Sequence, residues 1–173
     1  MSRKIKVGVI GAGRIGKMHI EHLATRLPET EIVAVADVNL DAADAIAAQF
    51  RIPIATVDCR ELFDDPQIEA VVICSATDTH AQFIREATEA GKHVFCEKPI
   101  DFDLERIDEV LTAVEQAGVK FQVGFQRRFD ASFRRVRETV ASGRIGEPHM
   151  LHIVSRDPEP PPVSYIKVSG GLF

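Results

Sequence analysis

A glycine-rich turn between an apolar run and a helical pattern constrains this chain more than any other feature. Residues 6–17 read KVGVIGAGRIGK, in which Gly11, Gly13 and Gly16 give the spacing G-x-G-x-x-G. The run before the glycines is typical of a buried strand, and apolar residues three and four apart after them indicate a helix. The glycines would allow a tight turn, close approach of a pyrophosphate and close packing of the helix on the strand. The stretch therefore predicts a dinucleotide site at a helix N-terminus.

An acidic residue at the end of the next apolar run supports this interpretation. Residues 31–37 read EIVAVAD and predict a second strand ending on Asp37, about 20 residues after the last glycine. A carboxylate there would accept a hydrogen bond from a ribose 2′-hydroxyl and repel a 2′-phosphate, and no arginine follows in residues 38–40, so NAD is favoured over NADP. The alternative is that Asp37 caps the next helix. Arg14 and Lys17 are either phosphate contacts or exposed helix charges.

Strand and helix patterns alternate along the next hundred residues. We expect strands at 52–57, 70–75, 93–96 and 119–125, and helices at 40–50 and 103–117 with a further helix ended by Gly91. Asp78 or Thr79 is expected to cap that further helix, and Asp101 or Asp103 the one at 103–117. This alternation predicts an α/β fold with a doubly wound parallel (Rossmann) sheet. Residues 75–77 would follow the central strand, at the edge where such sheets bind ligands.

The character of the sequence changes after residue 124. A basic helix is expected at 131–141 and a strand outside any βα unit at 149–155, and RDPEPPP at 156–162 cannot form regular structure. We therefore expect a dinucleotide-binding domain at 1–124, and at 125–173 the incomplete start of a second α/β domain.

Composition excludes several other functions. The net charge of −5 disfavours nucleic acid as a partner, and no apolar run approaches the roughly 20 residues of a membrane span. The N-terminus lacks the pattern of a secretory signal. Cys59, Cys74 and Cys96 are odd in number and lack metal-type spacing, which indicates reduced thiols and a cytoplasmic protein.

Candidate reactive residues follow the expected fifth strand. Glu97, Lys98 and Pro99 would lie at the same edge of the sheet as the glycine turn. Lys98 could hydrogen-bond a substrate hydroxyl and help move a proton, or be an ordinary surface lysine. His80, near another strand end, could contact the ligand or pack against the loop. His19 and His22 lie three apart on a helix and could bind a metal ion, but they have no acidic or cysteine partner nearby in sequence, so no metal site is expected.

These motifs together resemble a known family. GAGRIGKMH, Asp37, SATDTHAQF, EKP at 97–99 and QVGFQRRFD are similar to the Gfo/Idh/MocA oxidoreductases, and SRDPEPPPVSYIKVSGGLF resembles their inositol 2-dehydrogenase branch. The resemblance implies a Rossmann domain followed by an α/β domain that lines the substrate site and forms a homo-oligomer, either a dimer or a tetramer. It places the catalytic lysine at Lys98 and further substrate contacts at Arg127 and Asp157. Motifs and resemblance together give these expected cofactor contacts: Gly11, Gly13, Arg14, Ile15, Gly16, Asp37, Val38, Ser75, Ala76, Thr77, His80, Glu97, Lys98 and Gln126.

The sequence departs from this family pattern at its end. The family has an aspartate, and four residues later a histidine proposed as general base, just beyond the position of Phe173. We therefore expect an N-terminal part of an NAD-dependent dehydrogenase that oxidises a cyclic polyol, myo-inositol to the 2-keto product, with the 173-residue chain inactive by itself. The alternatives are a catalytically silent NAD-binding module and an oxidoreductase of the same family that acts on another sugar.

Overall fold

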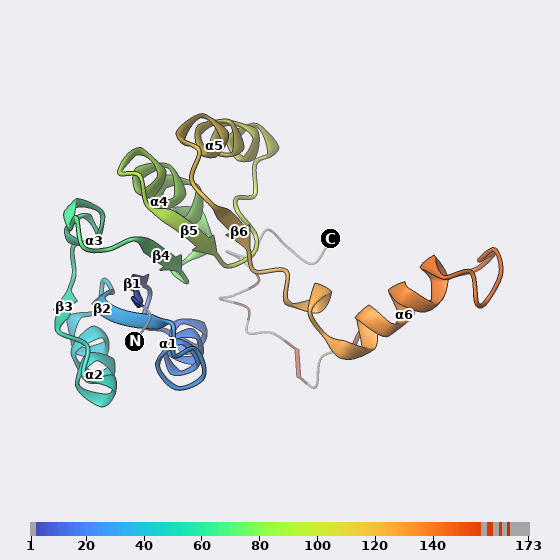
Figure 1. The fold of residues 1–173 in the computed structure, drawn as a ribbon, viewed down its shortest axis with the longest axis horizontal. Helices are drawn as coiled ribbons and strands as arrows, with labels where there is room; N and C mark the ends of the chain where they lie inside the picture. The colour runs from blue at the N-terminus through green and yellow to red at the C-terminus, as the bar shows by residue number, and fades with distance from the viewer. Residues whose placement is uncertain (1–2, 157–158, 161–162, 164–165, 167–173) are drawn as a thin grey trace. The chain divides into compact units, whose positions relative to one another are not determined.

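The computed structural model describes residues 3–156, 159–160, 163 and 166. It divides into two units, Met1–Gly124 and Phe125–Phe173, and each is described by itself. The first unit is built on a six-stranded sheet (Figure 1) with the strands β1 Ile5–Ile10, β2 Thr30–Ala36, β3 Ile54–Thr56, β4 Ala70–Ile73, β5 His93–Cys96 and β6 Phe121–Val123. The helices are α1 Arg14–Arg26, α2 Leu40–Phe50, α3 Arg60–Asp64, α4 Thr77–Glu89 and α5 Leu104–Ala117.

All neighbouring strands pair in parallel, in the order β3-β2-β1-β4-β5-β6. This order reverses between β1 and β4, which is the point where doubly wound sheets bind dinucleotides. The expected Rossmann fold is therefore confirmed. The third and sixth strands are shorter than the apolar runs suggested, because Pro53 cannot donate a ladder hydrogen bond and residues 124–125 lie beyond the last pairing.

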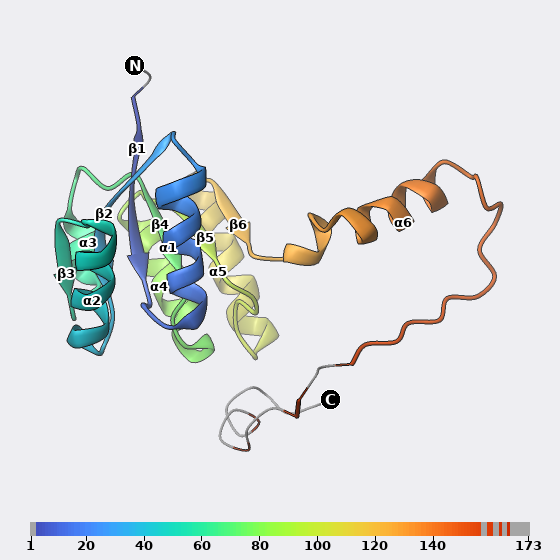
Figure 2. The same ribbon diagram turned by 90° about the horizontal axis from the view of Figure 1, so that it is seen from below.

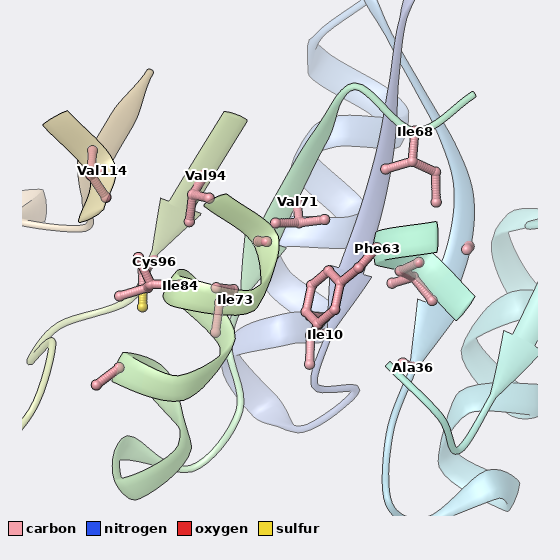
Figure 3. Close-up of a cluster of buried hydrophobic side chains, with 14 of the residues drawn as sticks. Ile10, Ala36, Phe63, Ile68, Val71, Ile73, Ile84, Val94, Cys96 and Val114 are labelled. Atoms are coloured by element: carbon pink, nitrogen blue, oxygen red, sulfur yellow. The ribbon is translucent and has the colours of Figure 1, made fainter. Parts of the chain in front are cut away.

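Two apolar clusters hold the helices on the sheet. α1 and α2 cover one face, and α3, α4 and α5 cover the other (Figures 1 and 2). The strands are buried on both faces, which explains why their sequences read as continuous apolar runs. Figure 3 shows the cluster on the face covered by α3, α4 and α5, which includes Ile10, Ile73 and Cys96 of three neighbouring strands.

The N-terminal caps of α4 and α5 differ from one expectation and decide between the two residues expected for the other. α4 begins at Thr77 with Ala76 as its N-cap and no side-chain cap bond, so neither Asp78 nor Thr79 caps it. The helix begins earlier than expected, and the Thr79 hydroxyl, already inside the first turn, donates to the Ala76 carbonyl oxygen at 2.7 Å. α5 is capped by Asp103, whose carboxylate accepts from Glu105 N at 2.8 Å.

The second unit begins with the 3₁₀ helix η1 Gln126–Arg128 and continues into α6 Ala131–Ala141, as the sequence predicted for the latter. Asp130 caps α6 by accepting from two backbone N–H groups of its first turn. The strand expected at 149–155 is wrong: these residues form no ladder. A strand needs a hydrogen-bonded neighbour, and no ladder partner for this segment exists among the described residues.

Candidate functional site: a dinucleotide cradle at the carboxyl edge of the sheet

The three glycines of the first turn meet three different requirements. Gly11 has φ +100°, and a Cβ there would lie 2.6 Å from the backbone of Cys74. A Cβ on Gly16 would lie 1.8 Å from the Gly11 carbonyl oxygen, so α1 packs on the turn because this residue has no side chain. A Cβ on Gly13 would meet nothing within 4 Å. The space in front of Gly13 is therefore open to an incoming group, as a cradle for phosphates requires.

The two helices at the switch point lack side-chain caps. Among the described helices of the first unit, α2 and α5 are capped by Asn39 and Asp103, whereas α1, α4 and the five-residue α3 begin without a side-chain cap bond. Of these three, α1 and α4 follow β1 and β4, the neighbouring strands between which the order reverses. The N–H groups of an uncapped first turn, together with the positive end of the helix dipole, favour an anion. The first turn of α1 contains no acidic side chain that would oppose one.

Asp37 lies at the end of β2 and contacts the glycine turn directly. Its Oδ2 accepts from Ala12 N at 2.6 Å, and its Oδ1 accepts from Asn39 N at 2.8 Å. A carboxylate has about four acceptor positions, so ribose hydroxyls still find free lone pairs. Val38, the next residue, has a side chain that is 96% exposed. Asp37 and Val38 thus fit the ribose and the flat base of a dinucleotide.

The end of β4 leads into residues 75–77, which the sequence predicts as cofactor contacts. Ser75 Oγ and Thr79 Oγ1 are 2.7 Å apart, and this bond orders the turn. His80 is buried, with Nδ1 at 2.7 Å from the Pro99 carbonyl oxygen and Nε2 at 3.1 Å from that of Ser75. Both ring nitrogens are thus engaged by the protein, which favours the packing role for His80 over the cofactor contact.

Glu97 and Lys98 leave β5 at the same edge. The Glu97 carboxylate Oε1 lies 2.9 Å from His19 Nε2 on α1. The Lys98–Pro99 peptide bond is cis, and the Lys98 side chain is exposed. No hydrogen bond or ion pair of Lys98 Nζ lies within the described part of the chain. Lys98 is therefore available to a hydroxyl group brought to this edge.

Two thiols lie close to Glu97. Burial and the neighbouring Glu97 carboxylate raise the pKa of Cys74 to about 12. Burial, with smaller effects of Cys74 and Glu97, also raises the pKa of Cys96. Both therefore stay protonated and unreactive at neutral pH, as expected of structural thiols.

The raised pKa of Cys74 predicts a loss of stability at alkaline pH. The unfolded chain releases this thiol proton above the ordinary value of 9.0, whereas the folded chain keeps it until about pH 12. The folded state then binds more protons, so the free energy of unfolding falls as pH rises between these values. We measure the free energy of unfolding in urea at about pH 8 and about pH 10.5. Between these values we expect it to fall by about 2 kcal/mol less in Cys74→Ala than in the wild type. Cys59, whose pKa burial also raises, is kept in both proteins, and equal losses in Cys74→Ala and wild type would contradict the prediction.

Three expected site residues lie in the second unit. Gln126 and Arg127 form part of η1, and the Arg127 guanidinium lies 5.3 Å from the centre of the Phe133 ring. Asp157 lies outside the described residues. Their roles stay predictions.

Sequence reasoning missed two residues of this edge. His19 was considered as a metal ligand without an acidic partner, yet Glu97 pairs with it across 78 positions of sequence. Gly124 was not singled out, although a Cβ there would lie 3.0 Å from Glu97 Oε1. No local signal marks either contact. Among the described residues no three His, Cys, Asp or Glu side chains are placed to hold a metal ion, and no described helix is long and apolar enough to cross a membrane.

Comparison with known proteins adds independent information. The profile of the Gfo/Idh/MocA oxidoreductase family, NAD-binding Rossmann fold, matches residues 5–125. The chain is 49% identical over 173 residues to the oxidoreductase YrbE of Bacillus subtilis, covering all of this chain and 50% of that protein. It is 48% identical over 169 residues to the inositol 2-dehydrogenase of Rhizobium meliloti, covering 98% of this chain and 50% of the relative.

A solved structure shares the fold. The scyllo-inositol dehydrogenase from Lactobacillus casei, with bound cofactor NAD(H) and scyllo-inositol, matches with a TM-score of 0.81 and 36% identity. The match covers 84% of this chain and 43% of that one. The chain thus spans about half the length of the relatives it matches.

Proposed function

The chain belongs to the Gfo/Idh/MocA family of oxidoreductases with an NAD-binding Rossmann fold, and we propose that it is the cofactor-binding half of a polyol dehydrogenase. The substrate we propose is an inositol, with myo-inositol oxidised to its 2-keto product. The reaction would transfer a hydride from a ring carbon to NAD and the proton of its hydroxyl to the general-base histidine of the family pattern. This proposal takes its substrate class from the relatives and its chemistry from the carboxyl edge described above.

One observation carries the proposal: an exposed lysine that makes no polar contact within the described residues shares a sheet edge with an open dinucleotide cradle. Lys98 follows β5, and the cradle lies between β1 and β4, with β4 and β5 direct neighbours. Parallel strands bring their carboxyl ends to one edge, so both features serve the same crevice.

The residues of the first unit fit NAD in detail. Gly13 and the first turn of α1 would hold the pyrophosphate, Asp37 the adenosine ribose, and Val38 the base. When bound, NAD supplies the acceptor for the hydride. Lys98 would donate a hydrogen bond to the reacting hydroxyl, which orients it and stabilises negative charge that develops on its oxygen.

Further parts of the proposal concern the rest of the enzyme. We propose that residues 125–173 begin the substrate-binding and oligomerisation domain, that Gln126 contacts the cofactor, and that Arg127 and Asp157 contact the polyol. The complete enzyme would be a cytoplasmic homo-oligomer. The arginine would donate to hydroxyl oxygens and the aspartate would accept from hydroxyl protons, which is the donor and acceptor pair that a polyol requires.

Cofactor titration and substrate turnover test the proposal together. We expect NADH to bind this chain at least about tenfold more tightly than NADPH, because Asp37 would repel a 2′-phosphate. Nicotinamide fluorescence reports binding directly, because the reduced ring is excited at wavelengths where protein side chains do not absorb. The full-length protein should reduce NAD with myo-inositol or scyllo-inositol, and simple aldoses are the comparison.

Each result separates two readings. Tighter binding of NADPH would contradict the choice of cofactor. Turnover of an aldose without turnover of either inositol would favour a same-family enzyme for another sugar. NADH binding without turnover of any polyol by the full-length protein would favour a silent NAD-binding module.

A further inference from the structure

The contact between His19 and Glu97 joins two elements that lie 78 positions apart along the chain. His19 lies on α1, and Glu97 follows β5. Their side chains are 20% and 18% exposed, and the 2.9 Å contact joins His19 Nε2 to Glu97 Oε1. Because both side chains are partly buried, solvent screens their interaction less than that of a fully exposed pair.

The surroundings of this pair form a fitted slot. The His19 ring packs against Phe95 with 5.1 Å between ring centres. A Cβ on Gly124 would lie 3.0 Å from Glu97 Oε1 and 3.1 Å from the Phe95 ring. The space for the carboxylate therefore depends on a glycine at the end of β6. Residues from α1, β5 and the end of β6 thus fix the position of Glu97.

Glu97 is also the first residue of the segment that carries Lys98. Its Oε2 accepts from Lys98 N at 3.3 Å. At the other end of the segment, His80 Nδ1 lies 2.7 Å from the Pro99 carbonyl oxygen. The backbone around Lys98 is thus held on both sides, while its Nζ remains unengaged within the described residues. A reactive group on a restrained backbone loses little freedom when the substrate arrives, which favours rapid reaction.

We propose that His19 is a positioning residue for Lys98. Acting through Glu97, it ties the Lys98 segment to α1, the helix whose N-terminus would receive the pyrophosphate. The His19 imidazole thereby links the helix that would bind the cofactor to the segment that places Lys98. The inference rests on the proposed function, because Lys98 needs a positioning residue only where it takes part in the reaction.

Chemical labelling of Lys98 tests the inference without enzyme activity. Lysines are labelled with pyridoxal 5′-phosphate and borohydride, and each site is read by peptide mass spectrometry. In this chain we expect His19→Leu to raise the labelling rate of Lys98 at least about threefold, because the segment gains local freedom. NAD should protect Lys98 in the wild type and protect it less in the variant. Lys120, before β6 at the opposite edge, is the internal reference.

Further variants keep this experiment decisive. Gly124→Ala narrows the slot from the other side and should raise Lys98 labelling in the same direction, even where His19→Leu folds poorly. His22→Leu, on the same helix, should leave the labelling unchanged. Equal Lys98 labelling in wild type, His19→Leu and Gly124→Ala would overturn the inference.

Kinetics of the full-length protein separate positioning from mere stability. We expect His19→Leu to lower kcat about ten- to a hundredfold, with the KM for NAD within about threefold of the wild type. His19→Gln, which keeps a donor for Glu97, should recover most of kcat. A lower Tm with unchanged kcat would overturn the inference. If the wild type binds no NADH, the proposed function fails, and the labelling of Lys98 without cofactor still decides whether His19 positions it.

Discussion

Replacing Gly13 by alanine is expected to leave the chain folded and to weaken NADH binding at least about tenfold. Gly13 is the N-cap of α1 with φ −70° and ψ −170°, a conformation that alanine adopts without strain. Its new Cβ would meet no protein atom within 4 Å. The methyl group would instead occupy the space that the pyrophosphate needs for its approach to the backbone. Fluorescence titration with NADH and thermal unfolding measure the two effects separately.

Gly16→Ala provides the contrast at the same turn. Its Cβ would lie 1.8 Å from the Gly11 carbonyl oxygen, so α1 would have to move away from the turn. We expect a loss of about 3 kcal/mol or more in the free energy of unfolding, because overpacking against a backbone atom cannot be relieved by a change of rotamer. If Gly13→Ala bound NADH as tightly as the wild type, the pyrophosphate would not approach the backbone at Gly13, and the proposed position of the cradle would be wrong.

Lys98→Met is expected to lower kcat/KM for the polyol about 10²- to 10⁴-fold in the full-length protein. Methionine has nearly the same length and loses the ammonium donor. Because Lys98 is exposed and makes no polar contact within the described residues, stability should change little, and any loss of NADH affinity reports the cofactor contact expected of Lys98. Steady-state kinetics, NADH titration and thermal unfolding of the same preparation measure all three.

Lys120→Met is the matched control for that substitution. Lys120 is also exposed, but it precedes β6 and so lies at the amino edge of the sheet. We expect it to retain full activity. Comparable activity of Lys98→Met and the wild type would show that Lys98 is an ordinary surface lysine, which would remove the observation on which the proposed function depends.

The glycine spacing, the apolar runs and Asp37 were sufficient to predict the Rossmann fold from sequence. Each of these signals is local: a parallel strand buried on both faces must be apolar along its length, and a turn that holds phosphates needs glycine. Helix α2 and helix α6 have the bounds that their patterns predicted. The strand at 149–155 was wrong because its pattern says nothing about whether a pairing partner exists.

The contacts between distant segments could not be read from the sequence. His19 and Glu97 are each ordinary in their local context, and their pairing depends on how α1 lies across the end of β5. From sequence, His80 could contact the ligand or pack against the loop, and the fold places its buried ring between two carbonyl oxygens. Local patterns therefore predicted which side chains gather at the carboxyl edge of the sheet, and the folded chain was needed to show which of them make no polar contact within the described residues.

The double use of Asp37 has a consequence for changing the preference of the proposed cofactor site. The carboxylate that would recognise the ribose also holds Ala12 N and Asn39 N in place. A substitution of Asp37 that makes room for a 2′-phosphate removes the acceptors of two backbone N–H groups in the same step, so cofactor selectivity and the order of the glycine turn change together. To change the preference from NAD to NADP, a first substitution should therefore supply another acceptor for Ala12 N. Asp37 is then replaced in a second step.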